Sequence, residues 1–221
     1  MKTIITAICI IVFNSLPFGE GWGGAFAQNP KYVSAMEKNI QLVDTATITV
    51  TLWQAANSFE RIANSEKTEW LPNYWAAYSF VMLTIIGNDK EQIDVYCDKA
   101  DAFLEKAEAI SKDNSEIITL KGFASAMRIN VNPMMRGRVY GPKSSEFYQQ
   151  AIKLDENNPR PYYLRGQGIM NTPVMFGGGA DKACPYLEKA MKKFETFKPS
   201  SSIMPSWGLP HCKKVYEENC K

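Results

Sequence analysis

The chain has 221 residues, of which 45% are hydrophobic and 22% are charged, and its formal net charge is +2. This composition provides enough apolar side chains for a folded core and argues against extensive disorder. The nearly balanced charge argues against a nucleic-acid-binding protein, which would normally carry a strongly basic face.

The first 27 residues have the features of a secretory signal peptide. Lys2 provides a positive charge, Ile4–Phe13 is a short apolar run, and Ala25-Phe26-Ala27 is a small-x-small cleavage pattern. We expect cleavage between Ala27 and Gln28 and a periplasmic or secreted mature protein, residues 28–221, with no transmembrane segment. The alternatives are a buried N-terminal helix or a lipoprotein anchored at Cys9, which lies too close to Lys2 for a normal apolar region.

Export would place the remaining cysteines, Cys97, Cys184, Cys212 and Cys220, where disulfides form. Cys212 and Cys220 would lie about 12 Å apart on one helix, beyond the reach of a disulfide. A bridge from Cys184 to either of them is more plausible, and free buried thiols are the alternative.

The chain alternates between helical periodicity and helix-breaking residues, and its only candidate strand is the short Thr47–Thr51 stretch. Breaks rich in Gly, Asn, Asp and Pro separate the periodic segments. The pattern predicts an all-α fold with helices at 31–45, 50–66, 71–87, 90–111, 115–130, 144–155, 160–171, 180–196 and 207–219.

Three of these helices share a small residue, a bulky residue and an alanine at offsets of four and three. Because such offsets place side chains on one helical face, the pattern indicates repeated close packing of helix pairs. A weaker copy lies at Ala56, Glu60 and Ala63. The three clear copies are Ala100, Leu104 and Ala107; Ser144, Tyr148 and Ala151; and Ala183, Leu187 and Ala190.

These repeats resemble the tetratricopeptide repeat (TPR) family over roughly residues 50–197, best over Ser144–Ala190, where Gly166 matches the first-helix glycine. The sequence also resembles exported TPR-like proteins of Gram-negative, Bacteroidetes-type bacteria. It departs from the family pattern at Glu156, where a proline is usual, and in enlarged turns at Asn132–Lys143 and Thr172–Asp181. The resemblance implies a single domain, residues 28–221, of antiparallel helix pairs stacked as a right-handed superhelix with a C-terminal capping helix.

The TPR resemblance further implies that ligands bind in a concave groove lined by the first helix of each pair. Aligning Gly122 and Gly166 with the family glycine selects eight of the groove side chains, and the Trp70–Tyr78 stretch adds Tyr74 and Tyr78. Their aromatic, methionine and amide groups suit peptide capture. For any one of them, a place in the core is the alternative. The predicted groove residues are Tyr74, Tyr78, Glu116, Phe123, Met127, Arg160, Tyr163, Gln167, Met170 and Asn171.

Two loops stand out beside the groove. The Met175–Gly179 loop lacks the lysine and hydroxyl residue of a nucleotide-binding loop, so we expect a flexible turn whose Phe176 packs on the core. The Asn132–Lys143 turn combines basic and apolar residues that could contact an acidic partner or lipid headgroups, and a solvated loop is the simpler interpretation.

No catalytic motif is present, and the only histidine, His211, has neither a positioned nucleophile nor a metal-ligand spacing around it. We therefore expect a non-enzymatic protein without cofactor or metal, which binds a protein or peptide partner in the cell envelope and no nucleic acid. The alternative is a small-molecule-binding accessory protein of a periplasmic transport system, favoured by the enlarged turns. The sequence does not indicate the oligomeric state.

Overall fold

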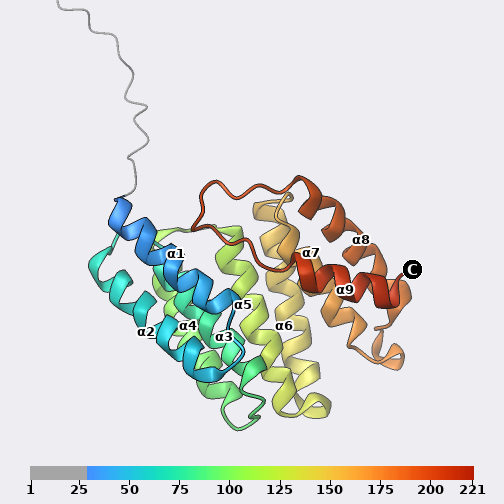
Figure 1. Cartoon of the computed structure of the whole chain (residues 1–221). Coiled ribbons are helices and arrows are strands. Elements are labelled where there is room, and N and C mark those ends of the chain that lie inside the picture. The colour runs from blue at the N-terminus through green and yellow to red at the C-terminus, as the bar shows by residue number, and fades with distance from the viewer. Residues whose placement is uncertain (1–28) are drawn as a thin grey trace, which may run out of the picture.

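The computed structural model describes residues 29–221, so the predicted signal peptide lies outside the described residues. Within this range all regular structure is helical (Figure 1). The α-helices are α1 (Pro30–Asp44), α2 (Thr49–Ser65), α3 (Leu71–Ile86), α4 (Ile93–Ile110), α5 (Ser115–Met127), α6 (Pro133–Leu154), α7 (Pro159–Met170), α8 (Ala180–Thr196) and α9 (Leu209–Asn219). Among residues 29–221, no helix is long and apolar enough to cross a bilayer.

Asparagine side chains fix the start of four helices. The side chains of Asn29, Asn114, Asn132 and Asn158 accept backbone N–H groups in the first turns of α1, α5, α6 and α7. Three of these helices also have a proline in the first turn, where its missing N–H needs no partner. These local signals explain why most helix starts could be predicted to within a few residues.

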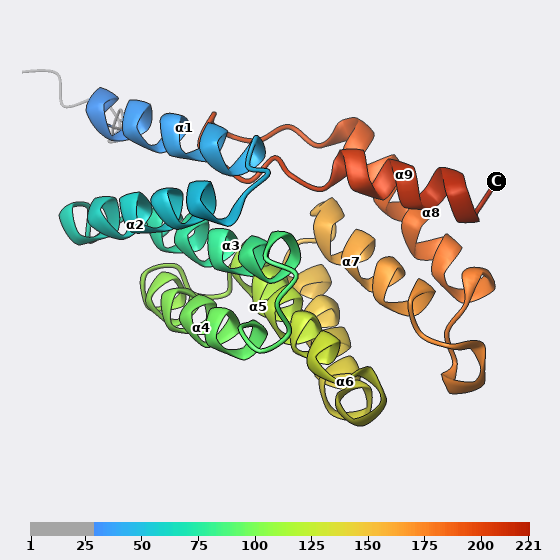
Figure 2. The same cartoon turned by 60° about the horizontal axis from the view of Figure 1, so that its bottom comes forward.

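The helices stack as antiparallel pairs, α1/α2, α3/α4, α5/α6 and α7/α8, followed by α9 (Figures 1 and 2). The small residues of the sequence repeat allow this close packing. A Cβ atom on Gly122 would lie 2.5 Å from the Tyr148 ring, and one on Gly166 would lie 2.8 Å from Leu187. The small, bulky and alanine positions of the three clear copies are all buried. The predicted all-α fold of stacked helix pairs is therefore confirmed.

The strand candidate and one loop of the sequence analysis differ from the structure. The Thr47–Thr51 stretch forms no strand, because α2 begins within it at Thr49, one residue from the predicted helix start. The Asn132–Lys143 segment is not a loop, because α6 begins at Pro133 and continues through Pro142. Asn132 caps this helix, and its first half lies largely exposed, so the proline is accommodated without disturbing a packed neighbour.

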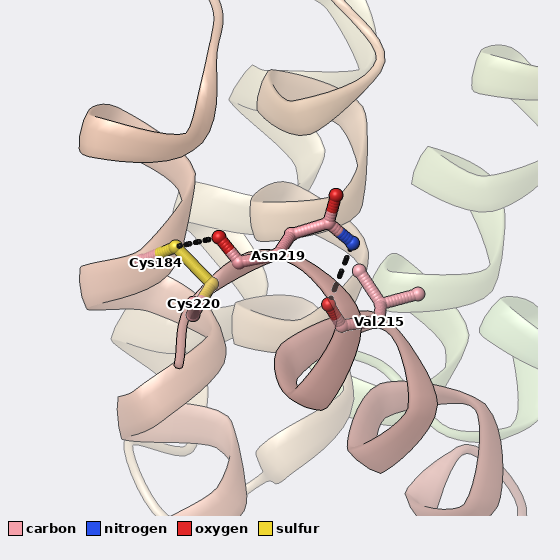
Figure 3. The surroundings of a disulfide bond; sticks show 4 residues. All are labelled: Cys184, Val215, Asn219 and Cys220. Carbon is pink, nitrogen blue, oxygen red and sulfur yellow. Dashed lines mark hydrogen bonds between the residues drawn. A yellow bond between two sulfur atoms is a disulfide. The ribbon is translucent and has the colours of Figure 1, made fainter.

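A disulfide joins the last helix to the repeat stack. Cys184 near the start of α8 bonds to Cys220 just after α9, with the two Cα atoms 5.6 Å apart (Figure 3). Cys97 and Cys212 are free and buried. Of the pairings left open by the sequence, the structure has Cys184 with Cys220, and Cys212 lies on the buried face of α9.

Candidate functional site

The structure gathers six of the ten predicted groove residues around one buried cluster. Tyr74 and Tyr78 come from α3, Glu116 and Phe123 from α5, and Arg160 and Tyr163 from α7; all six side chains are buried. The first helices of successive pairs therefore bring these positions together. One contribution to their burial is that the chain itself occupies this part of the groove.

The occupant is the segment of residues 197–208, which connects α8 to α9. Figure 1 shows it leaving α8, running towards α1 and returning to the start of α9. The Trp75 indole donates a hydrogen bond to the Ile203 carbonyl at 2.8 Å, and the Arg160 guanidinium donates one to the Pro205 carbonyl. Ile203 is completely buried. The segment therefore interacts with the groove through its backbone, as a bound peptide would.

Trp207 makes the largest side-chain contribution to this contact. Its ring stacks on Tyr78 with centroids 4.8 Å apart and lies 6.0 Å from Phe123. Its indole N–H donates to the Tyr74 hydroxyl at 2.9 Å. Only 8% of Trp207 is exposed, so the segment is integral to the core rather than a loose strand over it.

A buried ion pair lies below the segment. Arg160 is fully buried and donates to the Glu116 carboxylate at 2.8 Å. Burial raises the pKa of the Glu116 carboxyl, against the opposing effect of Arg160. The Arg160 guanidinium also lies 4.7 Å from the Phe197 ring. Arg160 thus contacts the 197–208 segment at Phe197 and at the Pro205 carbonyl and connects it to Glu116 of α5, while its Nε has no hydrogen-bond partner within residues 29–221.

The remaining predicted groove residues are more accessible. Met127, Gln167 and Met170 are half-buried and Asn171 is exposed. They come from the last turns of α5 and α7 or just after them, away from the contacts made by the 197–208 segment. These four residues form the part of the predicted groove that an external ligand could reach.

His211 has a structural partner. Its Nδ1 lies 2.7 Å from the Tyr163 hydroxyl, which links α9 to α7. Burial lowers the pKa of His211. Burial also raises the pKa of the Cys97 and Cys212 thiols to about 12, which disfavours the reactive thiolate form. The arrangement therefore provides no activated thiol beside the imidazole.

The turns within the helix pairs expose large apolar side chains. The prediction that Phe176 packs on the core is wrong, because its side chain is exposed next to Val174 and Met175. The α5/α6 pair exposes apolar side chains at the start of α6. The turns of the α1/α2 and α3/α4 pairs add apolar side chains that are less exposed. The exposed apolar residues at these turns are Ile48, Val50, Ile85, Val95, Met134, Met135, Val139, Val174, Met175 and Phe176.

An open cleft of about 560 Å³ lies elsewhere, between α1 and α2. It is lined by three cations, Lys31, Lys38 and Arg61, and by polar groups, with Tyr32 and Ile62 as its main apolar side chains. No sequence motif marks the residues of this cleft, so it could not be predicted from the sequence. Its mixed lining makes it a second surface to test for ligand binding.

Comparison with protein-family models gives no match, and comparison with curated protein sequences gives none. Comparison with solved structures finds the HusA haemophore from Porphyromonas gingivalis, with a TM-score of 0.76 and 32% sequence identity. The alignment covers 89% of this chain and 93% of that chain. Such identity over nearly the full length of both proteins shows that this chain belongs to the family of the HusA haemophore.

Proposed function

We propose that this chain is an exported, non-catalytic binding protein that carries a haem-type tetrapyrrole. The observation that carries the proposal is the 32% identity with a haemophore over 93% of that protein. This proposal is a specific form of the small-molecule alternative indicated by the enlarged turns. The tetrapyrrole is cargo here, taken up and released unchanged.

The surface chemistry of the chain supports such cargo. A haem group presents a broad apolar face and two carboxylates, so a carrier needs accessible apolar side chains with cations nearby. Large apolar side chains are exposed at the turns of the helix pairs, and methionines, which adapt to irregular shapes, are frequent among them.

A protein or peptide partner in the cell envelope is the second proposal, and one observation favours it. The groove already holds an irregular segment of this chain through hydrogen bonds to its backbone carbonyls, so its side chains can grip a peptide. An external peptide would have to use the accessible part, at Gln167, Met170 and Asn171. The double substitution Gln167→Ala and Asn171→Ala, which leaves the buried cluster intact, should then weaken capture of an envelope partner; unchanged capture in a crosslinking pull-down would count against this groove assignment.

The leading proposal is tested by titrating residues 28–221 with haemin and following the porphyrin absorbance band and tryptophan fluorescence. We expect saturable binding at one site with a dissociation constant of about 1 µM or tighter, corresponding to roughly 8 kcal/mol of binding free energy. The control is the same titration with a helical protein that does not bind haemin. Linear, unsaturable absorbance changes identical to that control would contradict the proposal.

A further inference from the structure

We infer that the cargo site is the turn edge, formed by the first turns of α6 (Met134, Met135, Val139) and the turn before α8 (Val174, Met175, Phe176). The ligand class is a planar, largely apolar molecule with carboxylates at its margin. This inference rests on the proposed function and adds the place where the cargo binds.

The exposure of these six side chains is the first argument. They are between 62% and 88% exposed, whereas the exposed large apolar residues away from the turns, Ile110, Leu154 and Leu209, are between 37% and 39% exposed. Clustered exposure of this kind is uncommon on a soluble monomer and is typical of a ligand or partner surface. Covering the turn edge with an apolar ligand would therefore remove these side chains from water and lower the free energy.

The turn before α8 is held in shape by its glycines. Gly177 and Gly179 adopt positive φ angles of 88° and 103°, and a Cβ on Gly178 would lie 1.9 Å from the Thr172 carbonyl oxygen. The Gly179 N–H donates to the Ile169 carbonyl at 3.1 Å. The glycines thus build a closed turn that holds Val174–Phe176 outwards, which differs from the flexible loop expected from the sequence.

The start of α6 is also held in place. The Arg136 guanidinium donates two hydrogen bonds to the Asp94 carboxylate of α4, at 2.7 and 2.8 Å. Around Gly137 and Gly141 nothing lies within 4 Å of where a Cβ would be, so this part of the helix has open surface. Figures 1 and 2 show the α5–α6 and α7–α8 turns at the same end of the helix stack. Two anchored apolar surfaces therefore lie at the same end of the molecule (Figures 1 and 2).

Charge is the third argument. Arg138 and Lys143 of α6 and Lys182 of α8 belong to the same two segments, and none of them forms an ion pair within residues 29–221. Three unpaired cations beside apolar side chains complement a flat apolar ligand with two carboxylates. They are fewer than the roughly four to eight basic residues typical of anionic-membrane recognition, which favours the small ligand over a bilayer.

The test compares haemin binding by wild-type residues 28–221 and by the triple variant Met135→Ser/Met175→Ser/Phe176→Ser. We expect the dissociation constant to rise about tenfold or more, with an unchanged melting temperature because the side chains are exposed. The matched control, Ile110→Ser/Leu154→Ser, removes apolar side chains away from the turn edge and should bind like the wild type.

A charge variant tests the carboxylate contacts. Arg138→Gln/Lys143→Gln/Lys182→Gln should weaken haemin binding several-fold, and more at low than at high ionic strength. The matched control, Lys31→Gln/Lys38→Gln, removes two cations from the α1–α2 cleft. Independently of any variant, methyl NMR signals of Met134, Met135 and Met175 should shift on adding haemin's iron-free analogue.

The outcomes separate the inference from the function. If the wild type binds haemin and both turn-edge variants bind equally well, the turn edge is not the site, while the proposed function stands. Loss of binding only in the Lys31/Lys38 control would move the site to the α1–α2 cleft. Binding of the edge to phosphatidylglycerol vesicles, lost in the triple variant while haemin binding persists, would make it a membrane surface. A wild type that binds no haemin would overturn both proposals.

Discussion

Replacing Trp207 by alanine tests whether the 197–208 segment is an integral part of the core. The change removes a ring that is 8% exposed and stacked at 4.8 Å on Tyr78, and a hydrogen bond to Tyr74. Truncating a buried aromatic residue costs about 3–5 kcal/mol. Because the change also removes two aromatic contacts and a hydrogen bond, we expect the unfolding free energy to fall by about 4–5 kcal/mol, the upper end of this range. That loss is a large part of the roughly 5–15 kcal/mol by which a typical domain is stable.

The assay is urea unfolding of residues 28–221 followed by far-ultraviolet circular dichroism, with wild type, Trp207→Ala and Trp207→Phe compared. The phenylalanine variant keeps the stacking and loses the N–H donor, so its unfolding free energy should lie between the other two. Ser206→Ala, an exposed neighbour, is the control and should match the wild type. A Trp207→Ala loss below about 1 kcal/mol would refute the packing described here, because a buried ring cannot be removed so cheaply.

Three further predictions follow from the same structure. Replacing Cys184 and Cys220 by serine opens a loop of sequence separation 36 and should lower the unfolding free energy by about 4 kcal/mol, measured against the oxidised wild type in urea. Gly137→Ala, at a helical position with open space around it, should raise the melting temperature through a gain of about 0.5–1 kcal/mol; a lower melting temperature would show that the site is crowded. Because the folded pKa of His211 is lowered, the unfolded chain binds more protons, and stability should fall as the pH drops below about 6.5; His211→Gln should flatten that part of a melting-temperature profile, and an identical slope would contradict the assignment.

The helix pairs could be predicted because their packing leaves a local record in the sequence. Gly122 and Gly166 are small where Tyr148 and Leu187 of the partner helices approach, and Tyr148 and Leu187 both occupy the bulky position of the small, bulky and alanine pattern. Such a pattern can be recognised from neighbouring residues alone, without knowing which distant residues are in contact. It therefore predicts where the helices lie and which helices pair.

The start of α6 escaped prediction because its local signals conflict. Gly137, Gly141 and Pro142 lie within twelve residues and are typical of a loop, yet Asn132 caps a helix there. A tertiary contact also holds this segment, the Arg136–Asp94 ion pair to α4, which no local pattern reveals. Tertiary contacts routinely override propensity in this way.

The sequence predicted which residues converge in the groove, but not that the 197–208 segment of the chain occupies it. Alignment on two glycines selected Phe123 and Arg160, and the Trp70–Tyr78 stretch added Tyr78; the three side chains do lie together around Trp207. The 197–208 segment has no periodicity, and its contacts, such as Trp75 with Ile203, join residues 128 positions apart. The assignment of the groove as an external binding surface therefore stays a proposal.

The most direct test of the account is a crystal structure of residues 28–221 grown with haemin. We expect one tetrapyrrole against Met134, Met135 and the Val174–Phe176 turn, with its carboxylates near Arg138, Lys143 or Lys182. The 197–208 segment should remain in the groove with Trp207 stacked on Tyr78. A tetrapyrrole in the groove in place of that segment, or in the α1–α2 cleft, would contradict the account.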